Sequence, residues 1–270
     1  MIGVPVKDYI SQNAIFTLCI IGLAEGAFFA WQKGNRHCAL AFVLLAIAFF
    51  ANILYATVSR TALLALPILL FLFAFRRLGW KSAAALAMAT MISLAMAWPT
   101  SAPLRQRVTE LFDVILNHQP RAIFSPAEQR IEFWRKSLVI VAEAPVFGHG
   151  TGSIRQQFEL LAAGHTGMAG LASGNPHNQV FATAIQLGLV GAVLLFAMWI
   201  AHLLLFFAPS LPAGIAFAVV VQNIISSQFN SSLFDFTPGW VYVLGVGVLG
   251  GMIVRDSVHN QKPPHERRTG

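Results

Sequence analysis

The chain has 270 residues, of which 56% are hydrophobic and only 11% are charged, and its net charge is +7. Soluble domains usually carry about 25% charged residues, so this composition excludes an ordinary soluble domain and predicts an integral membrane protein. The basic residues lie between apolar runs rather than on one face. Their placement therefore predicts no nucleic-acid partner and favours a positive-inside arrangement in a bilayer.

Seven apolar segments are long enough, or nearly so, to cross a bilayer, which takes about 20 residues of helix. They are residues 13–31, 39–57, 61–76, 82–98, 179–203, 211–228 and 239–254. The sequence therefore predicts an all-α, polytopic transmembrane bundle. Four transmembrane helices lie in residues 1–98, a long loop in residues 99–178, and three transmembrane helices in residues 179–254. No internal repeat is visible, which weakens a transporter built from duplicated halves.

Short basic connections predict which side of the membrane is cytoplasmic. Lys33 and Arg36 separate the first two apolar segments, and Arg76, Arg77 and Lys81 separate the third and fourth. The positive-inside rule assigns these connections to the cytoplasm, together with the basic tail of residues 255–270. The loop of residues 99–178 then lies on the opposite side. The tail is rich in Pro, His and Arg and is predicted to be disordered.

An amphipathic helix is predicted inside the long loop, near residues 126–143. Ser125 can cap it, Pro126 suits its first position, and Glu128 completes a capping box. At about 100° per residue the helix has a polar face and an apolar face. The polar face contains Glu128, Glu132, Arg135 and Lys136, and the apolar side contains Ile131, Phe133, Trp134, Leu138, Ile140 and Val141. Arg130 falls on the apolar side, which is unusual for a charged residue of a surface helix.

Three cationic or basic side chains are candidates for a site that binds an anion and moves a proton. Arg60 starts the third apolar segment after a possible N-cap, Ser59, and a helix N-terminus with a guanidinium favours anions. Arg130 would contact an anion held beneath the loop helix. His177 follows Asn175, a candidate N-cap, and Pro176, a candidate first helical residue. Because a helix N-terminus disfavours imidazolium, His177 is expected to stay neutral and able to accept a proton.

Each candidate also has a structural interpretation. Arg60 can reach the membrane interface without binding anything, Arg130 can pair with a carboxylate or stack on Trp134, and His177 can be solvated. Asp235 precedes a Thr237-Pro238 helix start, where it can cap or turn the chain, orient a base or bind an acceptor hydroxyl.

The sequence predicts no metal and no cofactor. It contains no Walker loop, HExxH motif, paired aspartates or nucleophile elbow. Cys19 and Cys38 lack the spacing of a metal site. Glu25 is a carboxylate inside a predicted span, which invites a functional interpretation, and the sequence does not identify its partner.

Five short motifs follow one another along the chain: SRTALL at 59–64, RIEFW at 130–134, APVFGHGTG at 144–152, PHNQ at 176–179 and GLVG at 188–191. Together they resemble the O-antigen ligase/polymerase superfamily. The similarity covers roughly residues 51–251. The run from Ser232 to Phe236, with Gly239-Trp240 after it, is closer to ligases than to polymerases. Members have more spans than the seven predicted here, so the resemblance leaves open a fragment, a wrongly assigned start or one half of a split protein.

The resemblance implies a metal-independent, inverting glycosyltransferase of the bacterial inner membrane, with its active site facing the periplasm. Its donor would be a glycan on undecaprenyl diphosphate, and its acceptor the lipid A core or another glycan. Arg60 and Arg130 would match the arginines that bind the diphosphate, and His177 the histidine that activates the acceptor. Alternatives are an O-antigen polymerase, a protein O-oligosaccharyltransferase, a polyprenyl-sugar transporter or flippase, and an inactive fragment.

Overall fold

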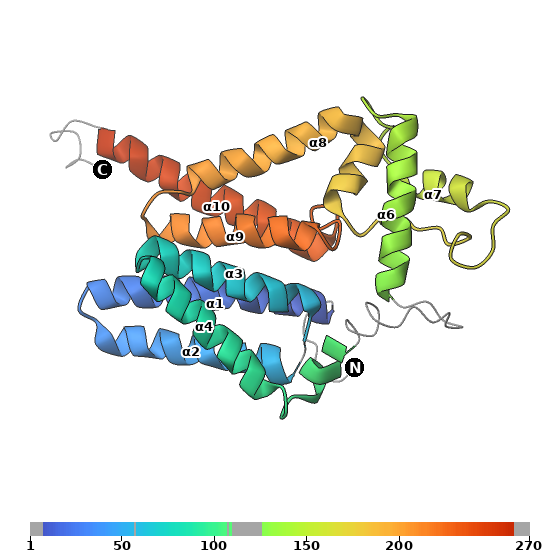
Figure 1. Ribbon diagram of the computed structural model, residues 1–270. Helices are drawn as coiled ribbons and strands as arrows, with labels where there is room; N and C mark the ends of the chain where they lie inside the picture. Colours follow the sequence, from blue (N-terminus) through green and yellow to red (C-terminus); the bar gives the residue numbers. More distant parts are fainter. Residues whose placement is uncertain (1–7, 57, 107, 110–125, 262–270) are drawn as a thin grey trace.

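The computed structural model describes residues 8–56, 58–106, 108–109 and 126–261 (Figure 1). These residues form helices and turns and contain no strand, which confirms the all-α prediction. The helices are α1 (Tyr9–Gln32), α2 (Arg36–Tyr55), α3 (Arg60–Arg77), α4 (Trp80–Ala97), α6 (Pro126–Glu143), α7 (Ile154–Ala162), α8 (Gln179–Leu205), α9 (Leu211–Ser227) and α10 (Phe236–Gln261).

The seven apolar segments of the sequence correspond to α1–α4 and α8–α10, which lie together in one bundle (Figure 1). Helices α1, α3 and α9 are at its centre, because α1 packs against α2, α3 and α9, and α3 packs against α4 and α9. Helix α9 also packs against α8 and α10. Helices far apart in sequence are thus neighbours in space.

Among the described residues, five helices are long and apolar enough to cross a membrane: α1, α2, α4, α8 and residues Phe236–Asp256 of α10. The chain is therefore a multi-pass membrane protein. Helix α9 is apolar but has only 17 residues, and α3 carries Arg60, Arg76 and Arg77 at its two ends. The total of seven spans stays a prediction.

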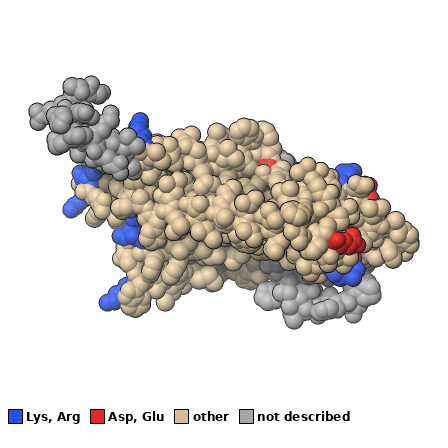
Figure 2. All heavy atoms as spheres, turned by 90° about the horizontal axis from the view of Figure 1, so that it is seen from above, with Lys and Arg blue, Asp and Glu red and all other residues tan. Residues whose placement is uncertain are grey.

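Helix α10 continues to Gln261. The expectation that residues 255–270 are disordered is therefore wrong for residues 255–261, because the helix of the last span extends beyond its apolar part; residues 262–270 lie outside the described part. Lys and Arg side chains gather at the end of the molecule where α10 ends, whereas Asp and Glu are visible towards the other end (Figure 2). The connections α1–α2, α3–α4 and α8–α9 lie at this basic end.

Helix α6 runs across the opposite end of the bundle, with α7 beside it (Figure 1). Its range is the one expected from the sequence, and the predicted cap Ser125 lies outside the described residues. The predicted faces need correction. Lys136 is 4% exposed, whereas Ile131 and Leu138 are both 59% exposed. The Lys136 ammonium donates hydrogen bonds to the carbonyl oxygens of Ala169 and Leu171, each at 2.6 Å, so loop carbonyls replace water around this buried charge.

Helix α8 is broken at Gly188, whose φ of 63° and ψ of −157° are not helical. In an uninterrupted helix, the N–H groups of residues 189 and 190 would bond the carbonyls of residues 185 and 186. Here Leu189 N–H donates to Pro145 O at 2.7 Å, and Val190 N–H donates to Val146 O at 3.3 Å.

The two carbonyls left by the break have partners in the same inserted segment. Ile185 O accepts from His149 N–H at 2.8 Å, and Gln186 O accepts from Gly150 N–H at 3.0 Å. Residues 145–150 thus lie between the two halves of α8 and replace each lost helical bond by two others. The insertion brings together the 144–152 and 188–191 motifs of the sequence.

The insertion requires glycine on both sides. A Cβ on Gly148 would lie 2.5 Å from the Gln186 carbonyl carbon, and a Cβ on Gly188 would lie 2.2 Å from Val146 O. Because the inserted segment directly follows α6, this junction fixes α6 against the first half of α8. It thereby positions Arg130, on α6, relative to His177, just before α8.

Candidate functional site

A cavity of about 140 Å³ lies at the end of the bundle that α6 crosses. Three of the four predicted site residues line it: Arg130, His177 and Asp235. Arg60 is not a lining residue, but its neighbour Thr61 is. The cavity is also lined by Asp8, Ile10, Ser11, Ala14, Ser226, Phe229, Asn230, Ser232 and Pro238.

Arg60 and Arg130 lie close enough to repel each other. Arg60 is the first residue of α3, and the Ser59 hydroxyl accepts a hydrogen bond from Ala62 N–H at 3.1 Å, which confirms the predicted N-cap. Burial lowers the pKa of the Arg130 guanidinium, and the positive charge of Arg60 lowers it further. An anion between the two guanidinium groups would offset both effects.

His177 is placed differently from the expectation. Helix α8 begins at Gln179 with Asn178 as its N-cap, because the Asn178 side chain accepts from Val180 N–H and Phe181 N–H. His177 therefore precedes the helix, with a left-handed φ of 54°. The Asn175 side chain does not cap α8. Its oxygen accepts from the backbone N–H of His177 at 2.8 Å and from the Ser231 hydroxyl at 2.8 Å.

This network fixes the proton on the imidazole of His177. A backbone N–H can only donate, so the Asn175 atom that it faces is the amide oxygen, and the other amide atom is the NH₂ group. That NH₂ donates to Asn230 Oδ1 at 3.0 Å. Nδ1 of His177 lies 3.3 Å from the same Asn230 oxygen and must donate to it. In the neutral ring, Nε2 is then the nitrogen with a free lone pair.

The surroundings of His177 favour the neutral ring. Burial lowers the pKa of the imidazole, and the charge of Arg130 lowers it further, whereas the hydrogen bond with Asn230 raises it. The direction agrees with the expectation from the sequence. The cause is different, since burial and Arg130 account for it.

Helix α6 also forms part of the wall around His177. The Phe133 ring is stacked on the imidazole, with centroids 6.1 Å apart and planes at 24°. The Trp134 indole N–H donates to the carbonyl oxygen of His177 at 3.4 Å. From the sequence, Phe133 and Trp134 were expected on the apolar side of this helix, and neither was expected to contact His177.

Two further side chains at the cavity were not predicted as site residues. Asp8 caps α1, and one of its carboxylate oxygens accepts from Ile10 N–H and Ser11 N–H, each at 2.8 Å. Asn230 lies in the connection between α9 and α10, and Asp235 directly precedes α10. The only signal for Asn230 in the sequence was its place in the polar run before Asp235.

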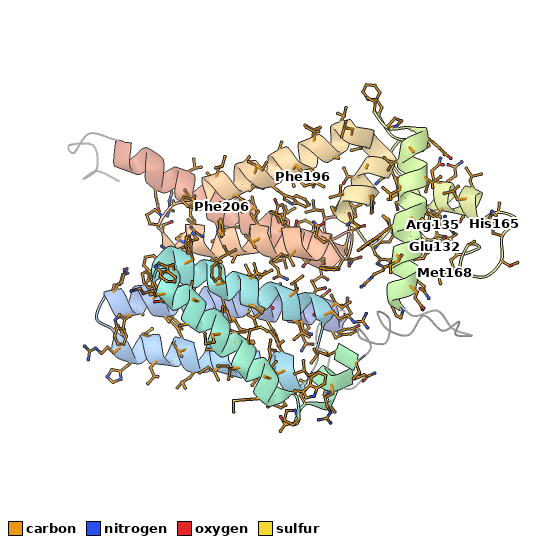
Figure 3. The ribbon with its side chains drawn as sticks, in the orientation of Figure 1. Glu132, Arg135, His165, Met168, Phe196 and Phe206 are labelled. Carbon is orange, nitrogen blue, oxygen red and sulfur yellow. The ribbon has the colours of Figure 1, made fainter. Side chains whose placement is uncertain are left out.

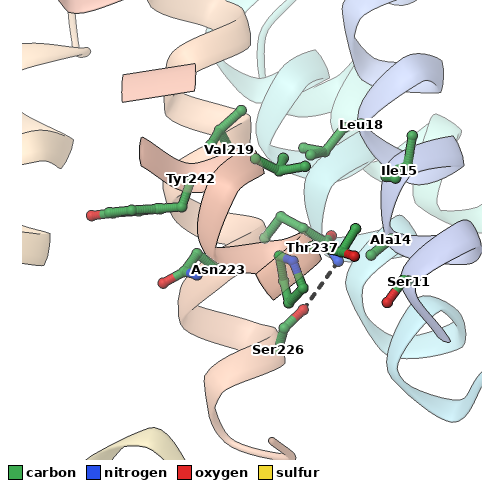
Figure 4. A pocket seen from close by; sticks show the side chains of 12 residues that line it. Ser11, Ala14, Ile15, Leu18, Val219, Asn223, Ser226, Thr237 and Tyr242 are labelled. Atoms are coloured by element: carbon green, nitrogen blue, oxygen red, sulfur yellow. Dashed lines mark hydrogen bonds between the residues drawn. The ribbon is translucent and has the colours of Figure 1, made fainter. Parts of the chain in front are cut away.

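A smaller pocket of about 30 Å³ adjoins this cavity and shares Ser11, Ala14, Ser226 and Pro238 with it (Figure 4). The Gln222 NH₂ donates to the Ser226 hydroxyl at 3.2 Å. The side-chain oxygen of Gln222 is buried and has no hydrogen-bond partner among the described residues. The volume is enough for about two water molecules, each needing roughly 10–15 Å³.

The family model described as O-Antigen ligase matches residues 45–196, which is more than half of the chain. The matched region includes Arg60, Arg130 and His177, and Asn230 and Asp235 lie beyond it, as does the run that favoured ligases over polymerases. Comparison with curated proteins gives no match. The chain belongs to the O-antigen ligase family of membrane proteins, whose activity is of glycosyltransferase type.

Proposed function

We propose that the protein transfers a glycan from undecaprenyl diphosphate to an acceptor hydroxyl at the periplasmic face of the inner membrane, and that the acceptor is the lipid A core. The observation that carries this proposal is the meeting of Arg130 and His177 in one cavity, beside the charge of Arg60. Donor, acceptor, inversion and metal independence belong to the proposal.

The two arginines would bind the diphosphate of the donor. As the bond between the anomeric carbon and the phosphate oxygen breaks, its electron pair stays on the diphosphate, which gains negative charge. Guanidinium groups bind phosphate oxygens in a bidentate manner and stay protonated. Repulsion between Arg60 and Arg130 would decrease as that charge develops, so the stabilisation would be greatest in the transition state.

His177 would act as the base. Its Nε2 would take the proton of the acceptor hydroxyl while the acceptor oxygen bonds to the anomeric carbon on the face opposite the diphosphate, which inverts that centre. Asn230, rather than Asp235, bonds Nδ1. Asp235 would accept a hydrogen bond from the acceptor glycan, which is the second of the two catalytic roles expected for it.

Replacing His177 by Ala tests the proposal. Loss of a proton-transfer group typically lowers a rate by about 10²–10⁴-fold, so purified H177A protein should insert and bind donor but transfer almost no glycan. H165A is the matched control, because His165 lies in an exposed loop away from the bundle (Figure 3). Near-normal transfer by H177A would contradict the role of His177.

The same assay separates the acceptors. Lipid-linked donor is supplied with lipid A core, with free glycan or with a pilin carrying an acceptor hydroxyl. Product with lipid A core alone supports ligation, whereas product with the other two indicates a polymerase or a protein transferase. A transporter would move the donor across the vesicle membrane without forming any product, and the rate of this movement would be unchanged in H177A.

A further inference from the structure

The segment inserted into α8 carries an exposed apolar tip that the proposed reaction does not use. Phe147 is 77% exposed and Val146 is 50% exposed. The α8 residues beside the break, Leu187, Leu189 and Val190, are exposed as well. The tip is continuous with them, since Gly188 lies directly against the backbone of Val146 and Phe147.

The length of α8 beyond the break places this tip near the edge of the hydrocarbon layer. From Leu189 to Leu205 the helix spans roughly 26 Å at 1.5 Å per residue, slightly less than the hydrocarbon thickness of about 30 Å. Its far end is marked by Arg76, which donates to Phe206 O at 3.0 Å, and arginines mark the level of the head groups. Gly188 is then at, or a few ångströms inside, the hydrocarbon boundary on the side of the cavity.

Entry into lipid is favoured because several polar backbone groups of the inserted segment are already paired, namely the carbonyls of Pro145 and Val146 and the N–H groups of Gly148, His149 and Gly150. A backbone N–H or carbonyl without a partner costs several kcal/mol in hydrocarbon. The groups freed by the break in α8 bond residues 145–150, and Nε2 of His149 lies 2.9 Å from Ile140 O. Residues 144–152 and 179–205 contain no Asp, Glu, Lys or Arg.

We propose that Val146 and Phe147 form a lipid wedge, inserted among the acyl chains of the leaflet on the side of the cavity. The wedge holds the end of α6 on the bilayer, and α6 carries Arg130. The cavity is thereby kept at the level of the lipid head groups. This inference depends on no step of the proposed reaction.

Spin labels test the wedge in the full chain. Cys19 and Cys38 are first replaced by Ala, because both are free thiols. Phe147→Cys and the control His165→Cys are then labelled with a nitroxide in vesicles of phosphatidylethanolamine and phosphatidylglycerol. Collisions with oxygen, which concentrates in lipid, are compared with collisions with a water-soluble nickel chelate. The ratio of oxygen to nickel collisions should be several-fold higher at position 147 than at position 165.

Two results would overturn the proposal. A label at position 147 that meets the nickel chelate as often as the label at position 165 lies in water. A label shielded from both reagents is covered by protein, which would indicate a second copy or another subunit. If Phe147→Cys fails to fold, Val146→Cys gives the same measurement, since its side chain is exposed on the same tip.

Discussion

His177 has a backbone conformation that residues other than glycine rarely adopt. A left-handed φ at such a residue costs roughly 1–3 kcal/mol and persists only where its surroundings impose it. Here Asn175 holds the N–H of His177, Trp134 holds its carbonyl, and Asn230 holds its Nδ1. The strain is consistent with a residue whose orientation matters more than its contribution to stability.

Asn230 gives a test of that orientation through the pH dependence of transfer. The base form of His177 exists above its pKa, which lies below the ordinary value, so activity should be lost as the pH falls through that pKa. Asn230→Asp places a carboxylate beside Nδ1, which typically raises such a pKa by about 1–3 units. The acidic limb should then move to higher pH. Asn230→Ala removes the hydrogen bond, so the limb should move to lower pH and the rate should fall because the Nδ1 proton is no longer held.

The measurement is the transfer rate between about pH 5 and pH 8, the range in which histidine titrates. Gln228→Ala is the control, since the Gln228 side-chain NH₂ donates to Ile224 O at 3.1 Å, at the end of its own helix. An acidic limb that stays in place in Asn230→Asp would show that Asn230 does not act on His177. A lower rate alone would not distinguish this role from a structural one.

The sequence could not decide which asparagine near His177 is the cap. As residue types, Asn175 and Asn178 are equally suitable N-caps. The choice depends on Asn230 and Ser231, more than 50 residues away, because both form hydrogen bonds with the side chain of Asn175. Arg130 was predictable because it breaks the amphipathic pattern of its helix. Lys136 was not, since the carbonyls that bury it belong to a distant loop.

The interrupted helix α8 depends on two glycines that face each other across the break. Replacing Gly148 by Ala should destabilise the protein, because its φ is 68° and its new Cβ would meet the backbone of residue 186. The backbone conformation alone accounts for roughly 1–3 kcal/mol, and the clash adds to it. Thermal unfolding in detergent, followed by tryptophan fluorescence, should show a lower midpoint.

Gly247→Ala is the matched control for this substitution. Gly247 lies within α10, and a Cβ there would have nothing within 4 Å, so Ala should be neutral or slightly stabilising by about 0.4–1 kcal/mol. Equal midpoints for Gly148→Ala and the original protein would mean that the segment is not inserted as described.

Hydropathy and periodicity predicted where the bundle helices lie and the range of α6, because both depend on residues near in sequence. They predicted α8 as a continuous apolar span. The break could not be foreseen, since its hydrogen bonds join residues 145–150 to residues 185–190, and a backbone contact leaves no periodic pattern. Glycine at positions 148 and 188 was the only trace in the sequence.

The two ends of the bundle have different chemistry. At the basic end, Arg77 lies 2.8 Å from Glu25, and both side chains are buried. Arg77 also donates to Pro209 O and Ser210 O, so this pair joins α1, α3 and the connection from α8 to α9. The sequence identified Glu25 as unusual but not its partner, which is 52 residues away. The cavity with His177 lies at the other end of the bundle, where residues at the ends of α1, α3, α9 and α10 line it.

The proposed function requires these two ends to face different compartments, and reporter fusions test this directly. Green fluorescent protein should fluoresce, and alkaline phosphatase stay inactive, when inserted at Gly34 or Gly79, in the short connections of the basic end. At His165, alkaline phosphatase should be active and green fluorescent protein should stay dark, because alkaline phosphatase needs an oxidising compartment to form its disulfides. The expected orientation, with the basic end in the cytoplasm, follows from the positive-inside rule applied to the basic residues around Gly34 and Gly79. If Gly34 and His165 report the same compartment, the two ends of the bundle do not face different compartments. If His165 reports the cytoplasm, the cavity cannot meet a periplasmic acceptor and transfer to the lipid A core is excluded.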